Sequence, residues 1–342
     1  MLGLPPLPRT IAAALRDSEH PREHVRTSAL ADLVRLSRLD ATRAAAIPGM
    51  LRVLAKDPSA GLRAEAALAL ADADASEARG GLFSALEDVE LRVRQFAVLA
   101  LGELAEPGDA ELAQRLLELS ESSEAALRFQ ALVALERIAP ERSEGALERG
   151  VEDTDDEVRA MAFRIAERRW PAGSAAPAWL TRAARSALSA ASSNVRAAAA
   201  FALAAQRDPA ANAVLVGVLD GSVRIGASDD LQTAIELAVT LGLDAARAPL
   251  ARRAFGVFGV RSDPIAWHAC VALARLGDAR ARQAILRRLA AFRYDVRTLA
   301  VAAAGQARLR EARAQIESFR ADPSRAAPEA VAEALRLLES GD

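Results

Sequence analysis

The side chains that could hold a metal or attack a substrate are few in this sequence and poorly spaced for either task. His268 and Cys270 lie two residues apart, and on a helix that spacing points the two side chains to different faces. His20 and His24 are four residues apart and could share a face, but no third ligand follows nearby. Cys270 is the only cysteine, which excludes an intramolecular disulfide, and its surroundings indicate a small buried residue.

An acidic cluster, made of Asp153, Asp155, Asp156 and Glu157, is the other candidate. It lacks the glycine and the ligand spacing of a calcium loop, and it is typical of a helix N-terminus with extra negative charge. The motifs of phosphate loops, dinucleotide folds, zinc proteases and serine hydrolases are also missing. The sequence therefore predicts no catalytic residue, no cofactor and no metal site, in a protein that is not an enzyme.

One arginine recurs at regular intervals, next to a turn that is mostly acidic. A basic stripe that binds a ligand is one interpretation. We favour a structural interpretation, because the spacing follows a repeat rather than any site. In it, each guanidinium reaches turn carbonyls or carboxylates of a neighbouring repeat. The six arginines of this ladder are Arg63, Arg94, Arg128, Arg159, Arg196 and Arg297.

These arginines occupy the second position of a repeated frame, V-R-x-x-A-x-x-A-L-G-x-L, which is clearest at residues 93–104. Nine copies follow one another at intervals of 31 to 37 residues. Positions 1, 5, 8, 9 and 12 are apolar and share one helical face. The composition, 51% hydrophobic but only 4% aromatic, is rich in helix-forming alanine and leucine. The sequence thus predicts an all-α, right-handed α-solenoid (superhelix) of about nine two-helix repeats, because one helix pair cannot bury its own face.

With the turn that precedes it, the frame reads D-x-x-x-x-V-R-x-x-A-x-x-A-L-G and resembles the short HEAT repeats of the phycobilisome-lyase type, over about residues 20 to 340. This resemblance implies a HEAT-like solenoid that binds other molecules, since most such proteins are scaffolds or adaptors. Some resemble chromophore lyases that load bilins, and others in the wider group bind DNA. No residue set of either activity carries over to this sequence, so a bilin-lyase-like enzyme or chaperone stays as the first alternative.

The frame divides the chain into four parts. Residues 1–20 are expected to form an N-terminal cap with one helix, since terminal repeats need a polar outer face. Residues 21–170 form an acidic half of HEAT-like repeats, and residues 195–342 form a basic half that includes a C-terminal cap. Residues 171–194 are an irregular connection with a helix, which we interpret as a longer loop between repeats.

The net charge of −2 hides an asymmetry. Residues 1–170 carry 22 basic and 30 acidic side chains, whereas residues 171–342 carry 22 and 16. Fields of this kind steer and orient partners. The basic half could contact an acidic protein surface, which we favour, or nucleic acid, or only solvent. Nucleic acid is the second alternative: arginine pairs such as Arg287-Arg288 are present, but aromatic residues are few and no dedicated motif occurs.

The partner-binding residues are expected on the concave surface, which the second helix of each pair lines in a HEAT-like solenoid. Frame positions 3, 7 and 11 point away from the core by the 3.6-residue period. Arginine and large aromatic residues dominate protein interfaces. The alternative is that a tight superhelix buries the aromatic residues between repeats. The candidates are Phe129, Arg137, Arg164, Arg168, Phe201, Trp267 and Arg275.

The sequence as a whole predicts a non-catalytic scaffold or adaptor that binds a protein partner on its concave face. No apolar run approaches the length of a membrane span, and the pattern of a signal peptide is missing at the start. A cytoplasmic protein without membrane insertion is therefore expected. Head-to-tail self-association stays open, because the two halves carry opposite charges.

Overall fold

The computed structural model describes residues 8–171, 173–226, 228–256 and 265–339, and every regular element within these ranges is a helix. The prediction of an all-α fold is therefore confirmed. The α-helices are α1 (Ile11–Asp17), α2 (Glu23–Ser37), α3 (Asp40–Lys56), α4 (Ala60–Asp72), α5 (Arg79–Ala85), α6 (Leu91–Leu104), α7 (Ala110–Leu119), α8 (Ala125–Ile138), α9 (Glu144–Gly150), α10 (Asp156–Arg169), α11 (Ala178–Ala187), α12 (Ser193–Ala205), α13 (Asn212–Asp220), α14 (Ser228–Thr240), α15 (Arg247–Phe255), α17 (Ala266–Arg275), α18 (Ala279–Leu289), α19 (Tyr294–Gln306), α20 (Arg313–Arg320) and α21 (Pro328–Glu339).

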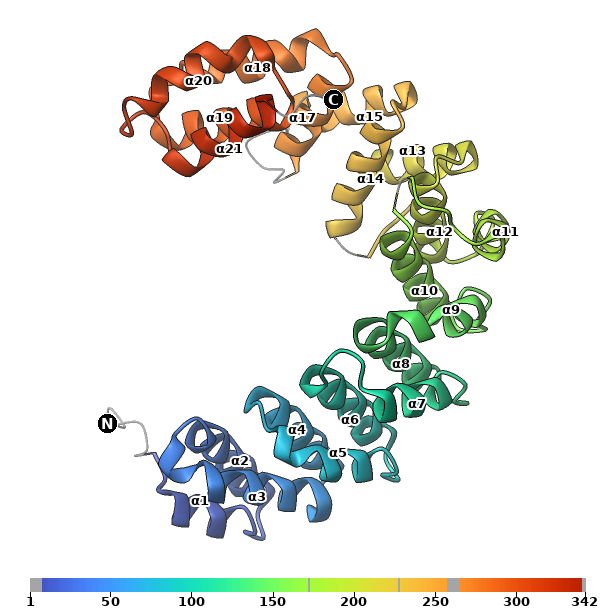
Figure 1. Cartoon of the computed structure of the whole chain (residues 1–342), viewed down its shortest axis with the longest axis vertical. Coiled ribbons are helices and arrows are strands. Elements are labelled where there is room, and N and C mark those ends of the chain that lie inside the picture. The colour runs from blue at the N-terminus through green and yellow to red at the C-terminus, as the bar shows by residue number, and fades with distance from the viewer. Residues whose placement is uncertain (1–7, 172, 227, 257–264, 340–342) are drawn as a thin grey trace. The chain divides into compact units, whose positions relative to one another are not determined.

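These helices follow one another as pairs, from α1–α2 to α20–α21, and each pair is one repeat. First helices contact first helices of adjacent repeats, as α1 contacts α3, and second helices contact second helices, as α4 contacts α6. Each unit of the chain therefore has two helix layers. In the last two repeats, α18 and α20 lie on one side and α19 and α21 on the other (Figure 1). The sequence frame falls in the second helices, which form what we call the second-helix face.

The described residues contain ten pairs, one more than the nine copies found in the sequence. The extra second helix is α21. Its Ala334 lies against Gly305 of α19, as Ala134 of α8 lies against Gly102 of α6. That register puts Pro328 at frame position 2, where the other clear copies carry arginine. The tenth copy is therefore hard to see in the sequence. At the other end, α1 packs on α2 as the first helix of the first repeat.

Small residues let neighbouring second helices approach closely. A Cβ atom added to Gly305 would lie 2.6 Å from the Cα atom of Ala334, a distance that real Cβ atoms do not reach. A Cβ atom on Gly102 would lie 3.2 Å from the Cβ atom of Ala134. The glycine at frame position 10 and the alanine at position 8 are therefore packing residues that have no room for a larger side chain.

Five second helices end in the same turn, with one residue in the left-handed region. In α17 this residue is Gly277, with a φ of 84°, and the amide of Asp278 donates to the carbonyl of Leu273. This bond defines the Schellman motif, which satisfies carbonyls at a helix C-terminus. The same turn at Gly242 gives the register of α14 and puts Leu231 at frame position 2. The left-handed residues are Asp74, Arg207, Gly242, Gly277 and Arg308.

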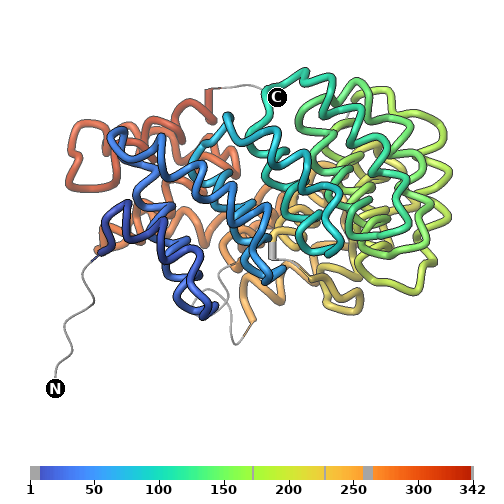
Figure 2. Tube along the Cα trace, turned by 90° about the horizontal axis from the view of Figure 1, so that it is seen from below, coloured from blue at the N-terminus to red at the C-terminus, as the bar shows by residue number. Residues whose placement is uncertain are grey.

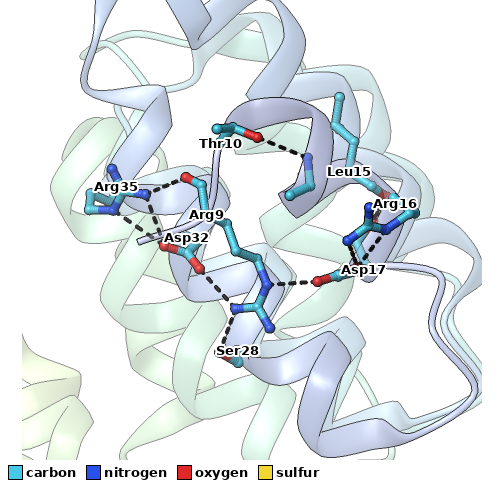
Figure 3. Close-up of polar contacts among 10 residues, drawn as sticks. Arg9, Thr10, Leu15, Arg16, Asp17, Ser28, Asp32 and Arg35 are labelled. Atoms are coloured by element: carbon cyan, nitrogen blue, oxygen red, sulfur yellow. Dashed lines mark hydrogen bonds and ion pairs between the residues drawn. The ribbon is translucent and has the colours of Figure 1, made fainter. Parts of the chain in front are cut away.

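The first repeat is joined by a polar network around Arg9 (Figure 3). Its guanidinium donates to Asp17 at the end of α1, at 2.8 Å, and to Ser28 and Asp32 of α2, at 2.7 and 2.9 Å. Arg35 donates to Asp32 and to the backbone carbonyl of Arg9, both at 2.9 Å. These bonds fix α1 on α2, so the expected cap is part of the first helix pair.

The chain divides into two compact units, residues 1–165 and 166–342, within which successive repeats stack side by side (Figures 1 and 2). In the second unit, the predicted irregular segment leads into α11, which packs on α12 as an ordinary first helix. The rings of Trp170 and Trp179 meet edge to face at 5.7 Å, and Gln206 donates to the carbonyl of Trp170 at 2.5 Å. Nowhere in the described ranges is a helix both long and apolar enough to cross a bilayer.

Candidate partner-binding face

The recurring arginine acts first within its own repeat, where it donates to carbonyls of the turn that precedes its helix. Arg94 donates to the carbonyls of Asp88 and Val89, at 2.8 and 3.1 Å. Arg196 donates to those of Ala190 and Ala191, at 2.7 and 2.9 Å. Such bonds satisfy turn carbonyls that have no partner in a helix. The remaining four make bonds of the same kind: Arg63, Arg128, Arg159 and Arg297.

Two of these arginines also pair with an aspartate of the next repeat. Arg63 donates to both carboxylate oxygens of Asp88, each at 2.8 Å. Arg128 donates to both oxygens of Asp153, at 2.7 and 2.6 Å. These guanidinium and carboxylate groups are all largely buried. Each ion pair therefore joins a second helix to the turn of the following repeat.

The other ladder arginines correct the prediction in part. Arg297 reaches the next repeat through the carbonyl of Arg325, at 2.6 Å, and not through a carboxylate. Within the described ranges, Arg94, Arg159 and Arg196 form side-chain hydrogen bonds only to their own repeat. The turns that follow Arg94 and Arg159 contain serine or alanine where the paired repeats have aspartate. The neighbouring contact thus depends on the turn residue rather than on the arginine.

The paired aspartates have a second role that explains their position. Asp88 also accepts a bond from the backbone amide of Glu90, at 2.9 Å, and this bond folds the turn. Asp153 accepts the equivalent bond from Asp155, at 2.8 Å. The hydrogen bonds from Arg63 hold the pKa of Asp88 below its usual value. The hydrogen bonds described for the ladder arginines are thus all made within the chain, to turn carbonyls and turn carboxylates.

The ladder arginine is missing from two successive second helices in the second unit. Leu231 of α14 and Ala266 of α17 take its place. The degenerate copy in the sequence therefore coincides with a change in structure. The same two helices form the walls of a groove on the second-helix face.

Three predicted partner-binding arginines, Arg137, Arg168 and Arg275, stand at frame position 11 of their helices. All three are exposed, and none forms a hydrogen bond or ion pair with another described residue. Of the other candidates in the first unit, Phe129 and Arg164 are half-buried. In these three helices, position 11 therefore presents an exposed charge on the second-helix face.

The aromatic candidates of the second unit are less accessible than predicted. Phe201 is only 2% exposed, so it is a core residue and cannot bind a partner. Trp267 is half-buried, and the guanidinium of Arg288 covers its ring at 4.9 Å. Burial between repeats, the alternative given for these aromatic residues, is correct for Phe201.

Phe201 is buried because α12 is covered along its length from Ala197 to Ala205. Ala197 and Ala205, the residues of α12 at frame positions 3 and 11, are also at most 3% exposed. Glu167 of α10 and Glu236 of α14 lie near enough on either side of this helix for their charges to interact. Burial raises the pKa of Glu167, and the charge of Glu236 adds to the rise while Arg168 opposes it.

The groove of the second unit has a volume of about 430 Å³, within the usual range of ligand sites of about 300–1,000 Å³. Its apolar side chains come from three second helices: Ile235, Val239, Val271, Ala272 and Leu337. Its polar side chains are Gln232, Glu236 and Thr240 of α14, His268 and Arg275 of α17, and Gln306 and Arg308 at the end of α19. It therefore combines an apolar surface with a polar rim. Of these residues, only Arg275 was predicted as a site residue.

The sequence could have indicated more of the groove. Glu236 and Thr240 stand at frame positions 7 and 11 once the turn at Gly242 registers α14. The degenerate copy hides that register, because it contains no arginine to align. His268 was considered only as a metal ligand, and Arg308 lies just beyond the frame.

A hollow of about 510 Å³ in the first unit offers a contrast. It lies beside the buried ion pair of Arg26 with Asp57, at 2.7 Å, and the pair of Arg52 with Glu19, at 2.9 Å. Most of its charged groups thus already have partners. This hollow therefore has fewer charged groups available to bind a ligand than its size suggests.

The residues considered for chemistry do not form a site. Burial raises the pKa of Cys270 to about 11, so the thiol is inert at neutral pH. Within the described ranges, no group of three or more His, Cys, Asp and Glu side chains is placed to hold a metal ion. Asp153 belongs to the ladder, and Asp156 pairs with Arg159 one turn along α10.

Comparison with known proteins identifies the repeat class. Residues 47–124 match a family model described as HEAT repeats. This match identifies residues 47–124 as HEAT repeats, and the paired helices continue the packing of an α-solenoid through the described residues on either side. No curated protein matches the chain significantly.

Solved structures of low sequence identity share this fold. YibA of E. coli is 16% identical with a TM-score of 0.54, over 79% of this chain and 93% of that one. A homology model of the AP-3 complex contains a chain that is 16% identical with a TM-score of 0.55, over 88% of this chain and 58% of its own length. Kap121p bound to Pho4p is 13% identical with a TM-score of 0.53, over 97% of this chain and 41% of its own. At these identities, the likeness concerns the fold alone.

Proposed function

We propose that this HEAT-repeat protein is a non-catalytic scaffold or adaptor that binds a protein partner on its second-helix face. The observation that carries the proposal is the groove of the second unit, where the exposed Arg275, which has no ion-pair partner among the described residues, borders an apolar surface. Arginine beside apolar side chains is typical of the centres of protein interfaces. Kap121p, which shares the fold, is a protein bound to another protein, Pho4p, in its solved structure.

The distribution of paired charges also favours this face. Several arginines of first helices already have carboxylate partners in adjacent repeats: Arg79 pairs with Asp109, and Arg282 with Glu311 at 2.7 Å. The position 11 arginines of second helices, such as Arg137 and Arg275, have no such partner among the described residues. A partner with acidic groups would therefore form more new ion pairs on the second-helix face than on the first-helix layer.

The test is affinity capture of the tagged full chain from a nuclease-treated lysate of its source organism. Two variants are compared with the wild type: R275E, on the second-helix face, and R287E, an exposed arginine of α18 in the first-helix layer. We expect a stoichiometric protein that R275E loses and R287E retains. Equal loss with both variants, or no captured protein, would overturn the proposal.

Two other outcomes would replace this function with another. Capture of nucleic acid when the nuclease is omitted, and its loss in R287E, would indicate a nucleic-acid binder that uses the basic half. Uptake of an added bilin, measured by absorbance, would indicate an activity like that of the phycobilisome lyases that the repeat frame resembles.

A further inference from the structure

We infer that the groove between α14 and α17 binds an extended peptide segment in which a carboxylate lies next to a large apolar side chain. This inference rests on the proposed function and gives the chemistry of the segment recognised. It is drawn from four features of the groove: its apolar floor, the exposed Arg275 on its rim, the place of Glu236, and the absence of the ladder arginine from both walls.

The floor of the groove selects an apolar side chain. Val239 of α14, Val271 of α17 and Leu337 of α21 are half-buried and face a common space of about 430 Å³. Ile235, beneath them, is only 3% exposed. An apolar side chain placed here would remove the remaining apolar area of these residues from water. The space is a groove rather than a closed cavity, so an extended peptide can continue beyond both of its ends.

The rim at the C-terminal ends of α17 and α19 selects a negative charge. Arg275 is exposed and has no hydrogen-bond or ion-pair partner among the described residues. Arg308 lines the same groove, two residues beyond Gln306. A guanidinium binds a carboxylate through two parallel hydrogen bonds, which gives both affinity and orientation. The carboxylate therefore lies at this end of the groove.

The opposite wall limits where an acidic group of the segment can lie. Glu236 stands one helical turn before Thr240 on α14, and both line the groove. The negative charge of Glu236 repels a second carboxylate, whereas a neutral or basic residue can lie beside it. A bound segment thus has its acidic group at the end near Arg275 and none beside Glu236.

The groove lies between the two successive second helices that lack the ladder arginine. Leu231 and Ala266 replace arginine at frame position 2 of both walls, so neither helix has a guanidinium at the position from which Arg63 and Arg128 reach the turn of the following repeat. In α4 and α8, Arg63 and Arg128 link consecutive repeats through carboxylates. The two walls thus depend on apolar contact, which a bound apolar side chain extends.

The experiment measures binding of synthetic decapeptides to the full chain by fluorescence anisotropy. The probe is a labelled peptide with a central Glu-Leu pair in a Gly/Ser background. Matched peptides carry Lys-Leu, Glu-Ser, or Leu with a free C-terminal carboxylate; the last of these distinguishes a side-chain carboxylate from a chain terminus. We expect the Glu-Leu peptide to bind at least tenfold more tightly than the Lys-Leu and Glu-Ser peptides.

Variants of the protein locate the site. R275E should weaken the Glu-Leu peptide at least tenfold and favour the Lys-Leu peptide, and V271D should abolish binding of both. E236Q should strengthen the Glu-Leu peptide by a few-fold, because a repulsive charge is removed. R287E, outside the groove, should change nothing. The unfolding temperature of each variant shows that the fold is retained.

The outcomes separate this inference from the proposed function. The inference is wrong if the protein binds the Glu-Leu and Lys-Leu peptides with equal affinity. It is also wrong if R275E binds the Glu-Leu peptide as tightly as the wild type does. A protein partner that is still captured, and that R137E rather than R275E releases, would leave the proposed function in place and move its site to the first unit.

Discussion

Arg63 and Asp88 form a two-bond ion pair, with both N–O distances at 2.8 Å, that joins α4 to the turn before α6. The same guanidinium donates to the carbonyl of Asp57 in its own turn, and the same carboxylate accepts from the amide of Glu90. One pair thus fixes two turns and the contact between two repeats. In a solenoid, stability depends on such contacts between neighbours, because each repeat touches only those beside it.

Removal of Arg63 should therefore destabilise the first unit. The substitution R63A leaves a largely buried carboxylate and a turn carbonyl without their partners, and we expect a loss of about 2–3 kcal/mol in unfolding free energy. Denaturant unfolding followed by circular dichroism measures it. R287A, an exposed arginine without a partner among the described residues, is the control. Equal stability of R63A and R287A would contradict the structural role of the ladder.

The contribution of this pair should depend on pH in one direction. The bonds from Arg63 lower the pKa of Asp88 in the folded chain. The resulting stability is fully present above the unfolded pKa of about 4, and it is lost as pH falls through the lower folded value. The difference in unfolding free energy between wild type and R63A should shrink as pH falls from about 5 to about 2. A difference that stays constant over this range would show that the charge on Asp88 is unimportant.

The close approach of α19 and α21 should make Gly305 intolerant of even one methyl group. In G305A the new Cβ atom would lie 2.6 Å from the Cα atom of Ala334, so one helix must move. We expect a loss of about 1–3 kcal/mol. Gly80 in α5 has no atom within 4 Å of the equivalent position, so G80A should be neutral or stabilising by up to about 1 kcal/mol. Thermal unfolding of the two variants distinguishes packing from helix propensity.

The repeated left-handed turn offers a stabilising change. Arg207 has a φ of 57°, a region in which a residue with a Cβ atom is strained, while Gly277 has the same place in another repeat. R207G should raise stability by up to about 1 kcal/mol, and G277A should lower it by about 1 kcal/mol. Unfolding temperatures of both variants test the turn. A loss of stability in R207G would mean that the arginine side chain outweighs the strain.

The carboxylate of Glu167 should destabilise the second unit at neutral pH. Burial and the charge of Glu236 raise its folded pKa, so the folded chain binds a proton more readily than the unfolded chain. E167Q should therefore raise the unfolding temperature at about pH 7.5 and have little effect near about pH 3, where the carboxyl is almost fully protonated in both states. An increase of the same size at both pH values would indicate packing rather than charge.

Much of the fold could be predicted from the sequence, because the same local interactions recur in every repeat. Short stretches of sequence are enough to recognise the apolar positions of the frame and the small residues at positions 8 and 10. The same is true of Arg63 beside an acidic turn. The tenth repeat could not be seen, because Pro328 replaces the arginine on which the alignment depends.

The candidate site was less predictable, because exposure depends on how closely neighbouring repeats pack. Arg275 was identified from the 3.6-residue period, and it does line the groove. The same rule assigns Phe201 to the same face, yet this residue is buried in the covered C-terminal part of α12. The period gives the direction of a side chain from its own helix, and only the neighbouring repeats decide whether that direction leads to solvent.

The most direct measurement is the affinity of the captured partner for the wild type, R275E and R287E, by titration calorimetry at fixed ionic strength. The account predicts that R275E weakens binding at least tenfold, or about 1.4 kcal/mol, while R287E binds as the wild type does. Equal affinities for wild type and R275E, or a loss confined to R287E, would contradict a partner held on the second-helix face of the second unit.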